Sequence, residues 1–268
     1  MSTTTAIPWP AKHDLFGVRV SATNYQQAID CLVAAARERM PAIASLQAVH
    51  AVMTASGDAE LRAMVNTFEI VGPDGQPVRW ALNLLHGVRL SQRVYGPELM
   101  LRLCERAALE QLPIFLYGGT PAVLTALEAG LQNRCPALQI AGSYAPPFRP
   151  LLDEEREDMI QRIRDSGARI VFIGLGAPKQ DRFAYEFRDR LSVVQVCVGA
   201  AFDFHAGMKR MAPRWMQNSG LEWLFRLVQE PRRLFRRYAV TNTQFVIKLL
   251  AAWRRKSSIN HGPIINLP

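Results

Sequence analysis

The stretch "RIVFIGLGAPKQ", Arg169–Gln180, carries the pattern on which the fold prediction rests. Its apolar run, Ile170–Leu175, is short and shows no alternation of apolar and polar residues. A strand that is covered on both faces has this character, whereas a strand with one solvated face alternates. The run passes through glycines into a segment with helical periodicity, Lys179–Leu191. A buried strand, a glycine-rich loop and a helix are therefore predicted here.

Units of the same kind recur along the chain. The predicted strands are Ala42–Leu46, Glu69–Val71, Ile114–Tyr117, Leu138–Ala141, Ile170–Leu175 and Val193–Val198. The predicted helices between them are Val49–Asn66, Val78–Leu85, Pro97–Gln111, Pro121–Arg134, Asp153–Ser166 and Lys179–Leu191. Alternation of this kind predicts an α/β fold with a doubly wound, mostly parallel, Rossmann-like sheet. The segment Phe16–Asn24 is either an added strand or a hairpin.

The net charge of +9 is unevenly distributed along the 268 residues. From Met208 onward, twelve Lys and Arg face only Glu222 and Glu230, which gives this part +10 and leaves the first 207 residues at −1. Two amphipathic helical segments, interrupted at Pro231, are predicted in the basic part. We therefore predict a catalytic body, residues 1–207, and a basic amphipathic helical tail, residues 208–268. Such asymmetry indicates an anionic partner: a membrane surface, a nucleic acid or a phosphorylated substrate.

The composition excludes several classes of protein. No run of about 18 uncharged apolar residues predicts a transmembrane helix, and the start of the chain does not resemble a signal peptide. The four cysteines form no CxxC pair and the five histidines show no ligand spacing. We therefore expect a cytoplasmic protein with reduced thiols, no metal site and no bound cofactor.

Glycine-rich loops follow several predicted strands, where parallel α/β sheets bind their ligands. Gly118 and Gly119 either let a phosphate approach a helix N-terminus or simply form a tight turn before Pro121. Lys179 stands where a dinucleotide fingerprint has its third glycine, so a dinucleotide-binding oxidoreductase is a weak alternative. Lys179 and Gln180 either bind substrate oxygens or are ordinary solvated residues. Asp203 either binds a sugar hydroxyl or caps the local backbone.

Asp74 lies in "VGPDGQPVRW", Val71–Trp80, directly after a predicted strand. Pro-Asp-Gly is a strong turn signal, and on local chemistry alone the turn interpretation is favoured. A carboxylate at a strand end can nevertheless act as a general base if it reaches the proton to be removed. Arg93 follows in "SQRVYGPEL" and either binds a phosphate through two parallel N–H···O bonds or is a surface arginine.

Six segments in this order give the chain a family resemblance. They are "PDGQPVRWALNLLHG", "RVYGPELM", "FLYGGTP", "GSYAPPF", "GLGAPKQDRF" and "VGAAFDFHAGMKRMAPRWMQNSGLEWLFRLVQEPRRLFRRY". Over about residues 16–238 the chain resembles the WecG/TagA/CpsF family of bacterial glycosyltransferases. The resemblance implies transfer of a hexose or N-acetylhexosamine from a UDP-sugar to a polyprenyl-pyrophosphate-linked saccharide, with inversion, at the cytoplasmic face of the membrane.

The resemblance also implies roles for individual residues. It makes Asp74 the general base, Arg93 a phosphate ligand and Gln180 an active-site residue. It maps Asp203 onto the family's motif Asp after the last body strand. Apart from the resemblance, Gly118, Gly119, Tyr144 and Lys179 are also predicted to contact substrate. Three tail arginines would close over the nucleotide; spacing assigns them to Arg226, Arg233 and Arg236. No metal ion would be needed.

The chain departs from the family pattern after its first sheet strand. Gln47, in Ser45–Ala48, stands where family members often have Asn, which leaves acceptor contacts at Gln47 open. The "PDGQP" and "SYAPPF" forms are closer to the GumM-like exopolysaccharide branch. The tail is expected to bind an anionic membrane surface and to complete the active site. An α/β protein that binds nucleic acid through the same tail is the chief alternative, although the body lacks the aromatic repeats of an RNA platform. The donor sugar, the acceptor and the oligomeric state stay open.

Overall fold

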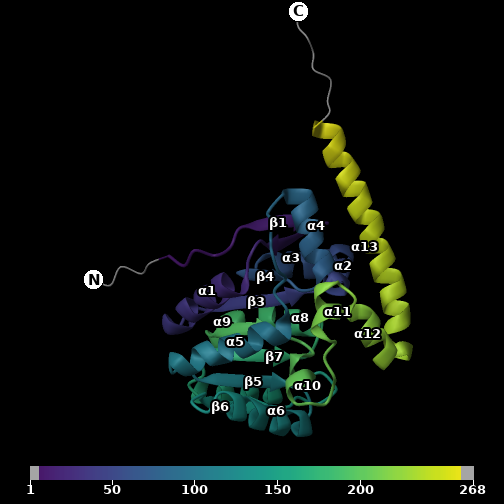
Figure 1. Ribbon diagram of the computed structural model, residues 1–268. Helices are drawn as coiled ribbons and strands as arrows, with labels where there is room; N and C mark the ends of the chain where they lie inside the picture. Colours follow the sequence, from purple (N-terminus) through teal and green to yellow (C-terminus); the bar gives the residue numbers. More distant parts are fainter. Residues whose placement is uncertain (1–5, 261–268) are drawn as a thin grey trace, which may run out of the picture.

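The computed structural model describes residues 6–260 and contains a three-layer α/β body with a helical tail (Figure 1). A hairpin comes first, formed by β1 (Lys12–Leu15) and β2 (Val18–Ser21). The strands of the main sheet are β3 (Ala42–Gln47), β4 (Ile70–Pro73), β5 (Ile114–Gly118), β6 (Ile140–Tyr144), β7 (Ile170–Gly174) and β8 (Val194–Cys197). All five pairings in this sheet are parallel, so the predicted fold class is confirmed.

The strand order is β4-β3-β8-β7-β5-β6. The sheet strands that come first and last in the sequence, β3 and β8, are therefore hydrogen-bonded neighbours. The chain leaves β3 outward to β4, crosses to β5, and returns inward to β8. Such a reversal opens a crevice at the carboxyl ends of the strands, where parallel α/β proteins bind ligands.

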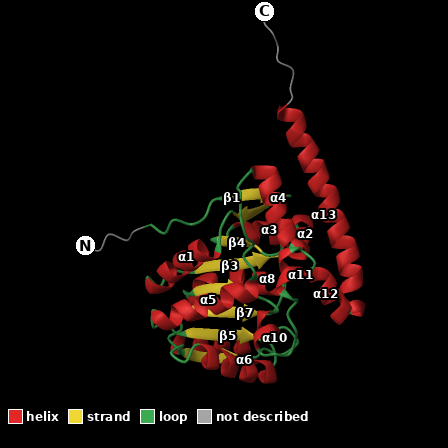
Figure 2. Ribbon diagram, in the orientation of Figure 1, coloured by secondary structure: helices red, strands yellow, loops and turns green. Residues whose placement is uncertain are grey.

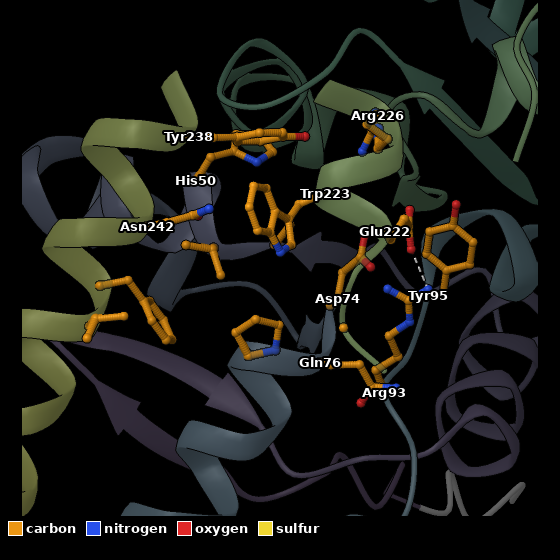
Figure 3. Close-up of a pocket in the computed structure, with 17 residues that line it drawn as sticks. His50, Asp74, Gln76, Arg93, Tyr95, Glu222, Trp223, Arg226, Tyr238 and Asn242 are labelled. Atoms are coloured by element: carbon orange, nitrogen blue, oxygen red, sulfur yellow. Dashed lines mark hydrogen bonds and ion pairs between the residues drawn. The ribbon is translucent and has the colours of Figure 1, made fainter. Parts of the chain in front are cut away.

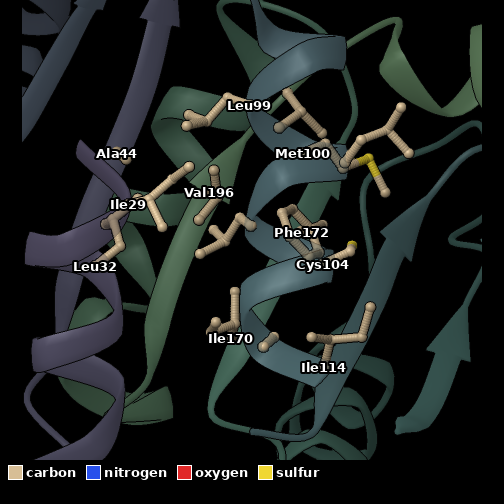
Figure 4. Close-up of a cluster of buried hydrophobic side chains, with 14 of the residues drawn as sticks. Ile29, Leu32, Ala44, Leu99, Met100, Cys104, Ile114, Ile170, Phe172 and Val196 are labelled. Carbon is tan, nitrogen blue, oxygen red and sulfur yellow. The ribbon is translucent and has the colours of Figure 1, made fainter. Parts of the chain in front are cut away.

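Two helical layers cover the sheet (Figure 2). Residues Ile43, Val171 and Ile173 face one layer, whereas Ala44, Ile170 and Phe172 face the other, because successive side chains of a strand point to opposite faces. The layer on the face of Ala44, Ile170 and Phe172, called the first layer, includes α1 (Tyr25–Arg37), α5 (Gly96–Leu109) and α6 (Pro121–Arg134). Figure 4 shows Leu99, Met100 and Cys104 of α5 packed over these strands.

The second layer holds two segments that are each predicted as one helix and are divided in the structure, beside helices close to their predicted bounds. Its helices are α2 (Val49–Gly57), α3 (Ala59–Asn66), α4 (Gln76–His86), α7 (Asp153–Asp165), α8 (Lys179–Glu186) and α9 (Arg188–Leu191). The predicted helix Val49–Asn66 is two helices, because Asp58 is extended and its side chain caps α3 at the N–H of Leu61. The predicted helix Lys179–Leu191 likewise breaks at Phe187.

Two short helices flank the predicted boundary: α10 (Ala201–His205) ends the body and α11 (Arg214–Asn218) begins the tail. It continues as α12 (Glu222–Gln229) and α13 (Pro231–Asn260). The predicted interruption at Pro231 is a helix start, since proline is well tolerated in a first helical turn. Phe245 packs into the body core against Phe16. Residues 1–5 of the predicted body and 261–268 of the predicted tail lie outside the described residues. Within the described part, no helix is both long and apolar enough to span a bilayer. All four cysteines are buried and free.

Candidate active site

Three pockets lie at the carboxyl ends of the strands. The central pocket, about 310 Å³, is formed by the loops after β3, β7 and β8 and by arginines of the tail. The tail pocket, about 300 Å³, lies between the loop after β4 and the helices α12 and α13. The outer pocket, about 640 Å³, lies beyond β7 and is bordered by Pro146–Leu151. Five residues line both the central and the tail pocket: Ala48, His50, Asp74, Tyr95 and Arg226.

Asp74 makes a turn and also faces the pockets. Its backbone N–H donates to the carbonyl oxygens of Gly72 (3.0 Å) and Gln47 (3.2 Å), and Gly75 follows with φ of 93°. Glycine is needed there because other residues rarely adopt positive φ. Figure 3 shows Asp74 in the tail pocket, and Asp74 also lines the central pocket. The turn and the base interpretations are therefore compatible.

The surroundings of Asp74 change its acidity. Burial raises the pKa of Asp74 to about 7, and the negative charge of Glu222 adds to this effect. The guanidinium groups of Arg93 and Arg226 and the N–H of Gly96 oppose it. A carboxyl with a pKa near neutrality is suited to accept a proton during catalysis and is characteristic of functional sites.

Arg93 is buried in the wall of the tail pocket, with 8% of its surface exposed. Its Nη2 donates to Oε2 of Glu222 at 2.6 Å, and its guanidinium lies over the ring of Tyr95 at 4.2 Å. Burial acts to lower the pKa of Arg93, but Glu222 and Asp74 outweigh it and raise the pKa. Arg93 is therefore a fixed cation next to Asp74 rather than a surface arginine.

Gln180 shapes the floor of the central pocket. Its Oε1 accepts the N–H of Gly176 at 3.1 Å, which closes the glycine loop onto the start of α8. Gly176 and Gly199 have φ of 76° and 54°, so both loops use left-handed backbone conformations. The first turn of α8 has no side-chain cap. The N–H groups of Gln180 and Asp181 in that turn instead donate to the carbonyl oxygens of Gly176 at 3.0 Å and of Pro178 at 3.1 Å.

Asp203 lies between the central and outer pockets and lines both. Its carboxylate pairs with Nζ of Lys209 at 2.9 Å, and its carbonyl oxygen accepts the N–H groups of Met208 and Lys209. The side chain of Asp203 stays about one-third exposed. Lys179 lines only the outer pocket.

Three tail arginines line the central pocket, and they are not all those assigned by spacing. Arg226 and Arg233 are there, but the third is Arg237. Arg236 is exposed and lines none of the three pockets. Helix geometry explains why Arg237 takes the place expected for Arg236. Arg233 and Arg237 are four residues apart on α13 and so share a helix face, whereas the adjacent residue Arg236 points elsewhere. Burial and these three arginines together lower the pKa of His50 to about 3, so His50 is neutral.

Besides Arg236, three predicted site residues line none of the three pockets. Gln47 is 1% exposed, and its Nε2 donates to Asp181 (3.2 Å) and to the hydroxyl of Ser45 (2.7 Å). Tyr144 stacks on Tyr117 with ring centroids 5.8 Å apart. These two residues line none of the three pockets.

Gly118 is the third, and it serves close packing of two strands. A side chain at Gly118 would meet the backbone of Gly174 at 2.8 Å, since β5 and β7 approach closely there. Gly119 lines the outer pocket only.

Several site residues were missed from the sequence. Glu222, Trp223, Tyr95, His50 and Arg237 line the pockets without having been singled out. The helical phase after Arg233 could have indicated Arg237, and the rarity of acidic residues in the tail could have indicated Glu222. Nothing local distinguishes Trp223 from other tail aromatics. Tyr95 is notable because its hydroxyl has no protein partner among the described residues.

A search of the described residues finds no group of three His, Cys, Asp or Glu side chains placed to hold a metal ion. The model of the glycosyl transferase WecG/TagA/CpsF family matches residues 13–259. This range includes all of the hairpin except Lys12, the whole sheet and almost all of the described tail.

Proposed function

Because this chain belongs to the WecG/TagA/CpsF family of glycosyltransferases, we propose that it transfers a hexose or N-acetylhexosamine from a UDP-sugar to a polyprenyl-pyrophosphate-linked saccharide, with inversion. The family makes the chain a glycosyltransferase of cell-surface polysaccharide synthesis. The observation that carries the finer proposal is the position of Asp74. Its carboxylate lies in a wall shared by a cationic, glycine-lined pocket and an apolar, aromatic one.

The donor diphosphate occupies the central pocket in this proposal. Arg226, Arg233 and Arg237 line it from the tail, and the Gly174–Gly176 loop and the start of α8 line it from the body. Guanidinium groups bind phosphate oxygens through paired hydrogen bonds. The nucleoside extends into the adjoining outer pocket, where the carboxylate of Asp203 can accept ribose hydroxyls. Lys179 and Gly119 border this pocket.

The acceptor occupies the tail pocket. Trp223, Tyr238 and Phe245 provide apolar ring surface, whereas Gln76 and Asn242 provide amides for hydroxyl groups. Sugar-binding sites need both, since a sugar ring has apolar faces and polar edges. Val246 also lines this pocket, and Leu250 and Trp253 follow at i+4 and i+7 on α13. These three side chains are about half exposed, so their stripe offers a path for the lipid chain.

The reaction is a single in-line displacement. The acceptor hydroxyl oxygen attacks C1 of the donor sugar while Asp74 takes the hydroxyl proton. The new C1–O bond forms as the bond from C1 to the phosphate oxygen breaks, and UDP leaves with the electron pair. Fixed cations stabilise the negative charge that develops on the diphosphate, and they act strongly because they need no reorganisation. Arg226, Arg233 and Arg237 are placed for this task, and Arg93 steadies the acceptor side.

The tail, residues 208–268, has two roles in this proposal. It completes the active site through its arginines, and it holds the enzyme at the inner face of the plasma membrane through its basic and apolar side chains. Phe235, Ile247 and Leu250 are exposed on α13, which also carries lysines and arginines. Amphipathic helices of this type bind anionic lipid surfaces.

Replacement of Asp74 by Asn tests the proposal most directly. We expect transfer to a lipid-pyrophosphate acceptor to slow about 10²–10⁴-fold while UDP still binds, because only the base is lost. Asp165→Asn, at an exposed position on α7, is the matched control and should transfer normally. Addition of EDTA should leave the wild-type rate unchanged. Near-normal turnover by the Asp74 variant would refute the assignment.

A further inference from the structure

Glu222 is a buried carboxylate that α12 brings into the active site. Only 8% of the residue is exposed, and its Oε2 accepts Nη2 of Arg93 at 2.6 Å. The other acidic residue of the tail, Glu230, pairs with Lys209 of the tail at 3.2 Å. Of these two carboxylates, only Glu222 forms an ion pair with the body. The turn signal at Asp74 and the spacing of the tail arginines do not explain why a carboxylate lies at this position.

Arg93 has two carboxylates as neighbours, because Asp74 and Glu222 line the tail pocket with it. Among the described residues, Arg93 forms an ion pair with Glu222 and none within 4.0 Å with Asp74. Its guanidinium is held further by the ring of Tyr95 and by Oε1 of Gln217, 3.4 Å from Nη2. Figure 3 shows the Arg93–Glu222 pair beside Asp74.

We propose that Glu222 is a positioning residue for the general base: it holds Arg93 in an ion pair so that the carboxylate of Asp74 stays free to accept the acceptor proton. The proposal rests on the proposed function, in which Asp74 is the base. Because Glu222 belongs to α12, the ion pair with Arg93 that leaves Asp74 free forms when the tail docks on the body. The tail would then supply a carboxylate as well as arginines.

The electrostatics around Asp74 support this role. The charged and titratable groups that face it are Tyr25 of α1, His50 of α2, Arg93 and Tyr95 before α5, and Glu222 and Arg226 of α12. Burial raises the pKa of Asp74 most, the arginines lower it and Glu222 raises it. Without the charge of Glu222, Arg93 is free to pair with Asp74, so the pKa of Asp74 falls. A weaker base removes the proton more slowly.

The test is the variant Glu222→Gln in the full chain, with kcat and kcat/KM measured from low to high pH. We expect the acidic limb of kcat/KM to move down by about one pH unit and kcat on the alkaline plateau to fall about tenfold, while KM for the donor stays within about twofold. A merely structural role would lower the whole profile and leave the limb in place. Glu154→Gln removes the same charge at an exposed position of α7 and should leave the profile unchanged.

Glu222→Asp separates charge from packing. It keeps the carboxylate, so its limb should stay at the wild-type pH even where kcat falls. An unmoved limb with unchanged kcat in Glu222→Gln would overturn the proposal, as would an equal limb shift in Glu222→Asp. If Glu222→Gln does not fold, the acidic limb of the kcat/KM profile of Glu222→Asp decides. If neither variant folds, Glu222 is a structural residue and the proposal is overturned. Near-normal turnover by Asp74→Asn would instead refute the base itself.

Discussion

At the scale of single residues, the pKa of Asp74 leads to the most direct prediction about the activity of the enzyme in solution. Burial raises its pKa to about 7. Below that pH the carboxyl is protonated and cannot take the acceptor proton, so activity should fall about tenfold for each pH unit toward acid. Above it, activity should reach a plateau. A pH profile of kcat/KM checks this, and an acidic limb near pH 4 would show that Asp74 behaves like an ordinary aspartate or is not the base.

The neighbouring residues Arg236 and Arg237 form a natural matched pair. Arg237 lines the central pocket and Arg236 is exposed. A hydrogen bond to a charged group contributes about 1.5–3 kcal/mol, so Arg237→Ala should weaken UDP binding roughly 10–100-fold. Arg236→Ala should change it less than about twofold, since surface charges contribute little. Calorimetric titration with UDP measures both, and a larger loss for Arg236 would favour the assignment by spacing.

At the scale of elements, the contact of α13 with the body depends on a few buried side chains. Phe245 is 3% exposed and meets Phe16 edge-on at 5.4 Å, and Lys248 donates to the hydroxyl of Ser56. Truncation of a buried Phe to Ala typically costs about 3–5 kcal/mol. We expect Phe245→Ala to loosen α13 locally rather than to unfold the sheet, because helices with few buried contacts open first.

Hydrogen exchange measures this effect along the chain. In Phe245→Ala the amides of α13 should exchange faster while those of β7 and β8 do not change. Ile247→Ala is the control, since Ile247 is 60% exposed two positions away. Equal exchange in the two variants would mean that Phe245 does not hold the helix.

The element boundaries show what local pattern predicts and what it misses. The run Pro121–Arg134 is one helix as predicted, because proline and a Thr120 cap begin it. The run Val49–Asn66 is two, because Asp58 prefers to cap the second helix rather than continue the first. Apolar periodicity continues through such a break, since both helices bury the same face in one core. Periodicity alone therefore could not reveal it.

At the scale of the whole molecule, the charge of the tail and the stripe Val246–Leu250–Trp253 predict membrane binding. Each basic residue near an anionic surface contributes about 1 kcal/mol, and salt screens this attraction. Wild-type protein should sediment with phosphatidylserine-containing vesicles, less so at high salt, and weakly with neutral vesicles. Replacing the three stripe residues by Ser should weaken vesicle binding about tenfold or more, since buried apolar area contributes about 25 cal/mol per Å². Leu109→Ser, at an exposed site on the body, is the control, and equal binding by both variants would refute the membrane role of the stripe.

The sequence by itself determined the parallel α/β fold, the order of its strands and helices along the chain, and the basic tail. It also indicated Asp74, Gln180 and Asp203, because parallel strands end at one edge and loops there converge. These inferences depend on local periodicity and on rules for connecting strands and helices, and both can be applied to one segment of the sequence at a time.

Only the tertiary structure decided which side chains of the tail meet the body. It brought Glu222 to Arg93, placed Arg237 instead of Arg236 in the central pocket, and buried Gln47 behind the strand ends. The phase of α12 and α13 against the sheet depends on how Phe245 and its neighbours fill the second core layer. That packing sums contacts between residues far apart in the chain, and no local pattern contains it.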